Sequence, residues 1–248
     1  MSKYSHLMQQ LETEQFAPDL APIPVLPSPG ADKNEHTQNR ETEALRLVRQ
    51  IFLRQTHLHE NQRPPRAVVF AGINHGDGCS HVCSAVAKTL ARNTLQSVCL
   101  VEANLRSPSL PGFLGTTNNY GLSDAILREG SVKSFAKQVF GNNMWLLSSG
   151  TPVEDARGLI ASDQSRQRFA ELREEFGFVL IDAPPLTRYT DALLLSPLSD
   201  GIVLILEGES SWRTGAEVVA HLRSIDVPIL AAVLNKHSLP VPCRATKC

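Results

Sequence analysis

Residues 68–80 read VVFAGINHGDGCS, and this stretch has the layout of a nucleotide-binding turn. An apolar run rich in β-branched residues leads into a glycine-rich loop, and a stretch compatible with a helix, Ser80 to Arg92, follows. In the pattern G-x-x-x-x-G-K-[ST], the glycines let backbone N–H groups surround phosphates, the lysine reaches the outer phosphates and the hydroxyl binds Mg²⁺. Gly76, Gly78 and Ser80 fit this pattern. The segment therefore predicts a strand, a phosphate-binding loop and a helix in succession.

Two positions of the loop depart from the pattern. Cys79 stands where the lysine is expected, and the first glycine is displaced by one residue, to Gly72. A charge-assisted hydrogen bond contributes about 1.5–3 kcal/mol, so the missing lysine weakens nucleotide binding by roughly one to two powers of ten. Loss of a positively charged group that stabilises a transferring phosphoryl group costs about 10²–10³ in rate. We therefore expect weak binding of ATP or ADP with Mg²⁺ rather than efficient phosphoryl transfer, although a turn with incidental glycines would explain the same residues.

Length, charge and cysteine content restrict the class of protein. A chain of 248 residues can form one large α/β domain, and its formal net charge of −1 argues against a nucleic-acid partner. Five cysteines without a secretory signal favour a cytoplasmic protein with free thiols. The apolar runs have the length of strands, so we expect any association with the membrane to occur through a partner.

The chain is predicted to have three parts. Residues 1–40 are rich in proline and polar side chains and are interpreted as a flexible N-terminal tail. Residues 41–238 form the predicted domain, and residues 239–248 a loose C-terminal tail. Within the domain, apolar β-rich runs alternate with helical stretches, which predicts a three-layer α/β fold with a mostly parallel sheet covered by helices on both faces. The predicted strands are 68–71, 98–101, 144–147, 178–181, 202–206 and 229–234, and the predicted helices are 43–55, 80–92, 122–128, 165–176, 191–198 and 212–224.

Two of these predicted strands lead directly into polar residues that suggest chemistry. The run from Phe178 ends in Asp182, which occupies the position of the carboxylate that orients Mg²⁺ in nucleotide hydrolases. Asp182 and Ser80 would then be the two groups that face the metal. A carboxylate at the end of a strand is also a common turn residue, so this assignment depends on the rest of the sequence. The other run begins at Val98 and leads into the residues Glu102 to Arg106.

The motifs taken together make the assignment more specific. From about residue 42 to residue 236, the chain resembles the bacterial tyrosine kinases of capsule and exopolysaccharide synthesis (BY-kinases, CapB/CpsD type), which are in the broad P-loop class of the MinD and ParA ATPases. The family pattern Asp-x-Asp-Leu-Arg reads Glu-Ala-Asn-Leu-Arg at 102–106, and I-D-x-P-P is present at 181–185. Further matches, in the family's order, are Gly121-Leu122-Ser123, Asp191-Ala192, Asp200-Gly201 and Val233-Leu234-Asn235.

This resemblance implies roles for individual residues. The catalytic carboxylates would be Glu102 and Asp182, and the Mg²⁺ ligands Ser80 and Asp182. The spacing E-x-x-R-x-x-R of Glu43, Arg46 and Arg49 is similar to the family's oligomerisation motif and places all three on one helix face; a solvated face with local Glu–Arg pairs is the alternative. The nucleotide would contact Gly76, Asp77, Gly78, Cys79, Ser80, His81 and Asn235, the last in the base pocket.

The departures from the family pattern indicate a pseudokinase. Cys79 replaces the lysine, Asn104 replaces a carboxylate, and the C-terminal tyrosine cluster that the family phosphorylates is missing, because the tyrosines are Tyr4, Tyr120 and Tyr189. The resemblance then implies a cytoplasmic regulatory partner of an inner-membrane polysaccharide co-polymerase. It would form a homo-oligomer or a hetero-oligomer with a paralogous kinase.

Three alternatives remain open. The first is a weakly active Mg²⁺-ATP-dependent tyrosine kinase or ATPase of the same family that uses Ser80, Glu102 and Asp182, with another basic group such as Arg106 in place of the lysine. The second is a positioning ATPase like MinD or ParA, which is disfavoured because the additional loop lysine of those proteins is absent. The third is a metal or thiol switch, because His75, Cys79, His81 and Cys83 lie within nine residues of each other.

Overall fold

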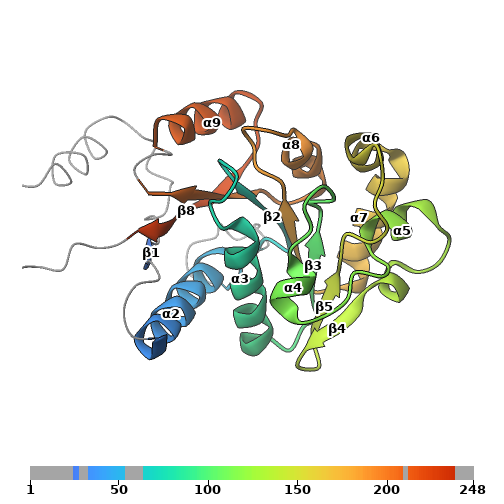
Figure 1. The fold of residues 1–248 in the computed structure, drawn as a ribbon, viewed down its shortest axis with the longest axis horizontal. Coiled ribbons are helices and arrows are strands. Elements are labelled where there is room, and N and C mark those ends of the chain that lie inside the picture. The colour runs from blue at the N-terminus through green and yellow to red at the C-terminus, as the bar shows by residue number, and fades with distance from the viewer. Residues whose placement is uncertain (1–24, 28–32, 54–63, 209–211, 238–248) are drawn as a thin grey trace, which may run out of the picture.

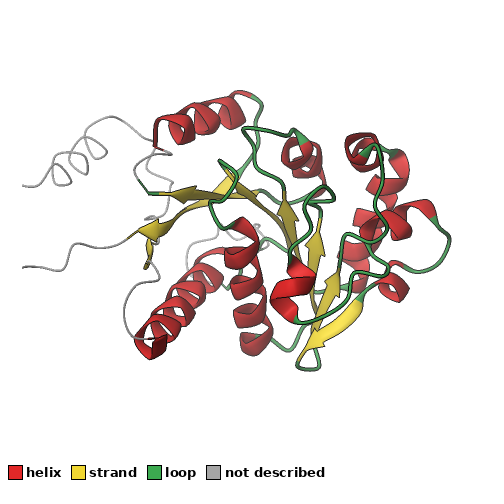
Figure 2. Cartoon of the chain, viewed as in Figure 1, coloured by secondary structure: helices red, strands yellow, loops and turns green. Residues whose placement is uncertain are grey.

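The apolar runs of the sequence form the centre of an eight-stranded sheet with helices on both faces (Figures 1 and 2). The computed structural model describes residues 25–27, 33–53, 64–208 and 212–237. The strand order is β1-β8-β7-β2-β6-β3-β5-β4, and every neighbouring pair is parallel except β4 and β5, which are antiparallel. The predicted α/β fold with a mostly parallel sheet is therefore confirmed.

The strands are β1 (Val25–Pro27), β2 (Ala67–Gly72), β3 (Val98–Glu102), β4 (Lys137–Phe140), β5 (Met144–Leu147), β6 (Phe178–Ala183), β7 (Ile202–Glu207) and β8 (Ile229–His237). The longer helices are α2 (Lys33–Ile51), α3 (Cys79–Asn93), α7 (Asp163–Glu175) and α9 (Trp212–Ser224). Short helices are α4 (Leu110–Leu114), α5 (Leu122–Leu127), α6 (Ala156–Ala161) and α8 (Asp191–Leu195), with 3₁₀ turns at Val132–Phe135 and Ser196–Leu198. None of the helices in the described parts of the chain is long and apolar enough to cross a membrane.

Alternating side chains of the central strands supply two separate hydrophobic cores. On β2, Val69 and Ala71 point to the core beneath α5 to α9, whereas Val68 and Phe70 point to the core beneath α2, α3 and α4. All six residues of β2 are buried, as expected for a parallel strand covered on both faces. The long apolar runs in the sequence are therefore central strands, whose two faces are covered by helices.

The six predicted strands and six predicted helices are all present, but the structure contains elements that the sequence did not indicate. Strand β4 is a short edge strand that begins with two exposed polar residues, so it lacks the apolar pattern of a buried strand. Strand β1 lies at the other edge, where a proline such as Pro27 is tolerated. Helix α2 begins at Lys33, ten residues before the predicted helix start at residue 43, because the polar residues before it continue the helix. The division into two tails and a domain stays a prediction. The other residues of both predicted tails lie outside the described parts.

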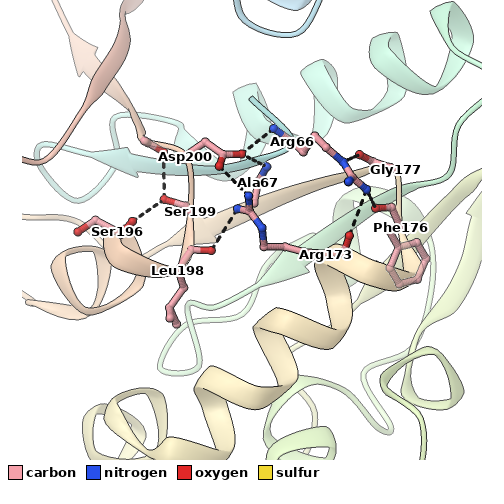
Figure 3. A network of polar contacts seen from close by, with 10 residues as sticks. Arg66, Ala67, Arg173, Phe176, Gly177, Ser196, Leu198, Ser199 and Asp200 are labelled. Carbon is pink, nitrogen blue, oxygen red and sulfur yellow. Dashed lines mark hydrogen bonds and ion pairs between the residues drawn. The ribbon is translucent and has the colours of Figure 1, made fainter. Parts of the chain in front are cut away.

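A polar network fixes the end of the sheet away from the glycine-rich loop (Figure 3). The carboxylate of Asp200 accepts hydrogen bonds from the backbone N–H groups of Arg66 and Ala67 at 2.7 and 2.8 Å, and from the guanidinium of Arg173 at 2.7 Å. The guanidinium of Arg66 donates to the carbonyls of Phe176 and Gly177 at 2.9 Å each. These contacts join the start of β2 to the end of α7 and to the turn before β7, and they lower the pKa of Asp200 through the Arg173 guanidinium and the two backbone donors, against the effect of burial.

Candidate functional site

The carboxyl ends of five parallel strands meet at one edge of the sheet, where ligands bind in open α/β folds. The glycine-rich loop follows β2, Glu102 ends β3 and Asp182 lies near the end of β6. In the sheet register, Glu102 is paired with Asp182. Asn235 belongs to β8 and is paired with Glu207 on β7. The fold therefore brings together the loop, both predicted catalytic carboxylates and the predicted base-pocket asparagine.

The loop has the backbone conformation of an anion-binding turn. Gly76 and Gly78 have φ angles of 95° and 85°, in the left-handed region that favours glycine. Within the described residues, the N–H groups of Gly78, Cys79 and Ser80 donate to no protein acceptor. These donors lie at the start of the fifteen-residue helix α3, whose N-terminus carries a partial positive charge. The glycine positions predicted from the sequence therefore serve a loop that can surround an anion.

Contacts from the neighbouring segments hold the loop in this shape. The carboxylate of Asp77 accepts from the backbone N–H of Asn74 at 2.7 Å inside the loop. The side-chain amide of Asn235 donates to the carbonyl of Asp77 at 2.8 Å, and the ammonium of Lys236 donates to the carbonyl of Gly76 at 2.6 Å. The backbone N–H groups of Leu186 and Thr187, after β6, donate to the carbonyls of Gly72 and Ile73 at 2.9 and 3.1 Å. The loop is thus braced from β8 and from the segment after β6.

Asp182 is a buried carboxylate that has the Ser80 hydroxyl and the Cys79 thiol beside it but accepts no hydrogen bond of good geometry. It is 1% exposed, and neither of its oxygens accepts a hydrogen bond within the described residues. The pKa of Asp182 is raised to about 7: burial has the largest effect, the hydroxyl of Ser80 and the thiol of Cys79 beside it lower the value, and the nearby Glu102 carboxylate raises it. A buried, unpartnered carboxylate next to a loop hydroxyl is the arrangement expected of a cation ligand.

Cys79 occupies the lysine position at the first residue of α3. Burial raises the pKa of its thiol well above the ordinary value, and the adjacent Asp182 carboxylate raises it further. The pKa of Cys83, one turn along the helix, is raised by the same two causes. Both thiols are therefore protonated at neutral pH. The side chain that replaces the lysine provides no charge for a phosphate.

Glu102 has a structural use that the sequence did not indicate. Its side chain is fully buried, and one carboxylate oxygen accepts from the backbone N–H of Ser109 and, at 2.8 Å, from that of Leu110. The other oxygen accepts from the backbone N–H of Ser149 at 3.4 Å. Burial raises the pKa of Glu102 while these three donors lower it. The carboxylate thus holds the start of α4 and the segment after β5, and its predicted catalytic role stays a prediction.

Asn104, which replaces an acidic residue of the family pattern, and Arg106 both have local partners. Asn104 accepts from the backbone N–H of Ser107 at 3.3 Å, as in an ordinary turn. Arg106 forms an ion pair with the buried Asp191 at 2.7 Å, and its guanidinium lies over the ring of Tyr189, 4.5 Å from the centroid. Arg106 is therefore already bound to Asp191 and Tyr189, and replacement of the missing lysine by this side chain would require breaking a buried ion pair.

The histidines and cysteines of the loop do not assemble a metal site. In the parts of the chain that the structure describes, no group of three or more His, Cys, Asp or Glu side chains is placed to hold a metal ion. His75 is exposed, and His81 lies edge-to-face with Phe113 at a centroid distance of 5.9 Å. The described residues therefore give the zinc hypothesis no support, and the raised thiol pKa values of Cys79 and Cys83 argue against a reactive thiol switch, because the thiolate is the reactive form.

The charged stripe of Glu43, Arg46 and Arg49 on α2 forms a local Glu–Arg pair, which is one of the two arrangements predicted for it. Arg46 donates to Glu43 at 2.7 Å as an i,i+3 ion pair, and Arg49 is exposed. One carboxylate oxygen of Glu43 is buried without a partner within the described residues. A local ion pair on a helix surface is sufficient to explain these residues, and the predicted oligomer contact stays a prediction.

Lys236 and Glu207 are the residues of this site that the sequence reasoning missed. Lys236 follows Asn235 at the end of β8, and its ammonium contacts Glu207 at 3.2 Å as well as the loop carbonyl. A signal was available, because the lysine comes directly after the family's Val-Leu-Asn motif. Lys236 was missed because we predicted that β8 would end at Leu234, whereas the strand continues to His237.

The fit between Gly78 and Asn235 leads to a stability prediction. A Cβ at Gly78 would lie 2.3 Å from Nδ2 of Asn235, so Gly78→Ala would displace the amide from the Asp77 carbonyl in addition to straining a left-handed residue. We expect a loss of about 2–3 kcal/mol in the free energy of unfolding, measured by urea denaturation. Gly76→Ala is the matched control: its φ is also positive, but no atom lies within 4 Å of the added Cβ, so only about 1 kcal/mol should be lost. Equal losses would show that the contact with Asn235 is unimportant.

Comparison with known proteins agrees with this geometry. No family profile matches the chain. A putative tyrosine-protein kinase, CapB of Staphylococcus aureus, is 24% identical over 172 residues, which is 69% of this chain and 75% of CapB. The tyrosine-protein kinase YwqD of Bacillus subtilis is 24% identical over 178 residues, 71% of this chain and 75% of YwqD. The homologues of this chain are thus bacterial tyrosine-protein kinases, and the resemblance found from the motifs is confirmed.

Solved structures show the same fold. The chimerical protein CapA2B2 superposes with a TM-score of 0.74 at 19% identity, covering 95% of this chain and 99% of that one. The septum site-determining protein MinD of Pyrococcus horikoshii, solved with Mg-ADP, gives a TM-score of 0.59 at 20% identity over 69% of this chain and 70% of MinD. The chain therefore has the fold of the MinD-like P-loop proteins.

Proposed function

We propose that this chain is a pseudokinase of capsule or exopolysaccharide synthesis, which binds ATP or ADP with Mg²⁺ weakly and regulates an inner-membrane polysaccharide co-polymerase. It would act at the cytoplasmic face of the membrane, as a homo-oligomer or with a paralogous kinase. The observation that supports this most directly is a loop with the phosphate-binding backbone and an uncharged thiol, Cys79, in place of its lysine. Binding requires mainly the backbone donors, whereas phosphoryl transfer also requires the charge.

The remaining residues of the centre support the same proposal. The relatives named above are tyrosine-protein kinases. One relative is the succinoglycan biosynthesis transport protein ExoP of Rhizobium meliloti, which is 24% identical over 175 residues, or 69% of this chain and 22% of ExoP. In this chain, the second carboxylate of the family pattern is Asn104, and Glu102 is used to hold the backbone of neighbouring segments. A kinase that had kept its activity would be expected to keep these groups free for catalysis.

Asp182 and Ser80 fit a magnesium ion. Mg²⁺ prefers carboxylate and hydroxyl oxygens and phosphate, and the two oxygens of Asp182 have no other partner within the described residues. A bound cation would favour the ionised carboxylate, whose pKa is otherwise about 7. When bound, the ion would neutralise phosphate charge, and Asp182 and Ser80 would orient it against the loop.

The regulatory role is tested by genetic complementation. In a strain of the host that lacks the gene, we expect the wild type and the double variant Ser80→Ala, Asp182→Asn to restore the same distribution of polysaccharide chain lengths, because the function does not depend on phosphoryl transfer. The tagged chain should co-purify with a polysaccharide co-polymerase from native membranes, identified by mass spectrometry. Absence of the co-polymerase from such preparations, or complementation by the wild type alone, would contradict the proposal.

A second candidate is a weakly active ATPase or tyrosine kinase, which the adjacent positions of Ser80 and Asp182 favour. Phosphate release from Mg-ATP by the wild type is then compared with release by the double variant Ser80→Ala, Asp182→Asn. We expect equal rates for the two proteins, because the loop lacks its lysine. A rate at least tenfold above that of the double variant would favour the enzyme over the pseudokinase.

A further inference from the structure

Two consecutive residues at the end of β8 contact two consecutive carbonyls of the glycine-rich loop. Asn235 donates to the carbonyl of Asp77 at 2.8 Å, and Lys236 donates to the carbonyl of Gly76 at 2.6 Å. Asn235 is 9% exposed, and the Cε atom of Lys236 lies 4.0 Å from the position of a Cβ on Gly78. The two side chains therefore cover the same part of the loop, and their strand β8 lies on the other side of β2 from β6, which carries Asp182.

This contact has a geometric consequence for the loop. In a trans peptide, the C=O and N–H of one unit point in opposite directions. Because the carbonyls of Gly76 and Asp77 are held toward β8, the N–H groups of the same peptide units, those of Asp77 and Gly78, are turned away from β8. The N–H of Gly78 has no protein acceptor within the described residues, and that of Asp77 has only a long contact of 3.4 Å to Asn74. Asn235 and Lys236 thus orient the donors that a phosphate would meet.

Lys236 has an unusual backbone conformation, which would not be expected if its side chain only covered a surface. Its φ is 56°, in the left-handed region, which is unfavourable for a residue with a Cβ and is retained mainly where the surroundings fix it. The ammonium is partly exposed and also contacts Glu207 at 3.2 Å. Lys236 therefore places a positive charge at the loop, in a chain whose loop position 79 has none.

We propose that Lys236, together with Asn235, is a positioning residue for a nucleoside polyphosphate: by holding the carbonyls of Gly76 and Asp77 toward β8, the two side chains turn the loop N–H groups toward the phosphates, so that the loop backbone binds them without the lysine that Cys79 replaces. This inference rests on the nucleotide binding in the proposed function. The second observation that points to a ligand here is the buried, unpartnered carboxylate of Asp182 beside Ser80. Affinity for phosphates then depends on position 236 more than on the thiol at position 79.

The test measures the dissociation constants of Mg-ADP and of adenosine by calorimetry for the full chain and its variants. Lys236→Met should weaken Mg-ADP binding ten- to a hundredfold and leave adenosine binding unchanged, because adenosine has no phosphates. Lys236→Arg should retain most of the Mg-ADP affinity. Lys236→Gly is a second variant that removes the amine but accommodates the left-handed φ, so its thermal unfolding should match or exceed that of the wild type while its Mg-ADP affinity falls.

Each other outcome decides against the proposal. Equal Mg-ADP affinity in the wild type and both amine-free variants would overturn it. A parallel loss for adenosine and Mg-ADP would show that Lys236 contacts the base and does not position the phosphate donors. No Mg-ADP binding by the wild type would also overturn it, but the co-polymerase experiment would still test the regulatory role, because complementation does not depend on this measurement.

Discussion

Asp182→Asn should stabilise the protein at pH 8 by roughly 3 kcal/mol while leaving its stability near pH 4 almost unchanged. The carboxylate is buried, has no hydrogen-bond partner within the described residues and has a pKa of about 7 against an ordinary value of 3.8. Ionising it in the folded state is therefore unfavourable. An asparagine has a similar shape and no charge, so this cost disappears in the variant.

The direction of this pH effect on stability follows from how many protons the folded and unfolded states bind. Between pH 3.8 and about 7, the folded wild type holds a proton on Asp182 that the unfolded chain has lost, so stability falls as pH rises through this window. One pKa unit corresponds to about 1.4 kcal/mol, so a shift of about three units limits the effect to roughly 4 kcal/mol. The free energy of unfolding should be measured by guanidinium denaturation from pH 4 to pH 8 in the absence of Mg²⁺ and nucleotide.

Asp200→Asn is the matched control with the opposite sign. Asp200 is the ion-paired carboxylate of the network at the far end of the sheet (Figure 3), and its pKa is lowered. The ionised carboxylate of Asp200 stabilises the folded state fully above its unfolded pKa, and this stabilisation is lost as pH falls through its folded pKa. We expect this variant to lose about 1.5–3 kcal/mol at pH 7 and less in acid. Parallel pH profiles for the two variants would contradict the assignment of Asp182 as an unpartnered buried charge.

The central part of the fold could be predicted because burial on both faces leaves a simple signal. Short continuous apolar runs rich in β-branched residues, such as residues 202–206, favour a central strand, and Trp212–Ser224 was predicted with the observed bounds. The edge strands β1 and β4 were not predicted, because an edge strand needs no apolar alternation and can contain proline. The start of α2 was misplaced, because the polar residues after Lys33 have the composition of a tail although they extend the helix.

The site was predictable in its positions but not in its contacts. Sequence order placed Asp182 at the end of one strand and placed Cys79 and Ser80 after the loop that follows another, and the parallel sheet brings these strand ends together. Whether a carboxylate is free depends on backbone donors far away in the sequence. The partners of Glu102 lie seven, eight and forty-seven residues along the chain, so its use for holding α4 could not be inferred from local sequence.

Cys79→Lys should strengthen Mg-ADP binding about ten- to a hundredfold. The loop backbone is already in the required conformation, so the substitution adds a charge-assisted contact to the phosphates of about 1.5–3 kcal/mol without reorganising the loop. The new ammonium also lies next to Asp182, whose pKa should fall from about 7 because an opposite charge favours the ionised form. Calorimetric titration with ADP and ATP, with and without Mg²⁺, measures the change.

Cys79→Met separates the charge from the length of the side chain. It extends the side chain without adding an ammonium, so its affinity for Mg-ADP should stay near that of the wild type. Equal gains in the two variants would mean that packing at position 79, not charge, limits binding. Tyrosine phosphorylation should not return in Cys79→Lys, because Asn104 still replaces a carboxylate.

Combining Cys79→Lys with Lys236→Met tests whether the two positions serve the same phosphates. If Lys236 positions the loop donors that bind the phosphates, its removal should cost less affinity once position 79 carries a lysine that contacts the same phosphates, so the two effects should be non-additive. Additive effects would mean that the positions act on separate parts of the ligand. Non-additivity would instead explain how a loop that has lost its usual cation remains a phosphate site: its backbone donors are held in place from β8, which contacts the loop through the Gly76 carbonyl.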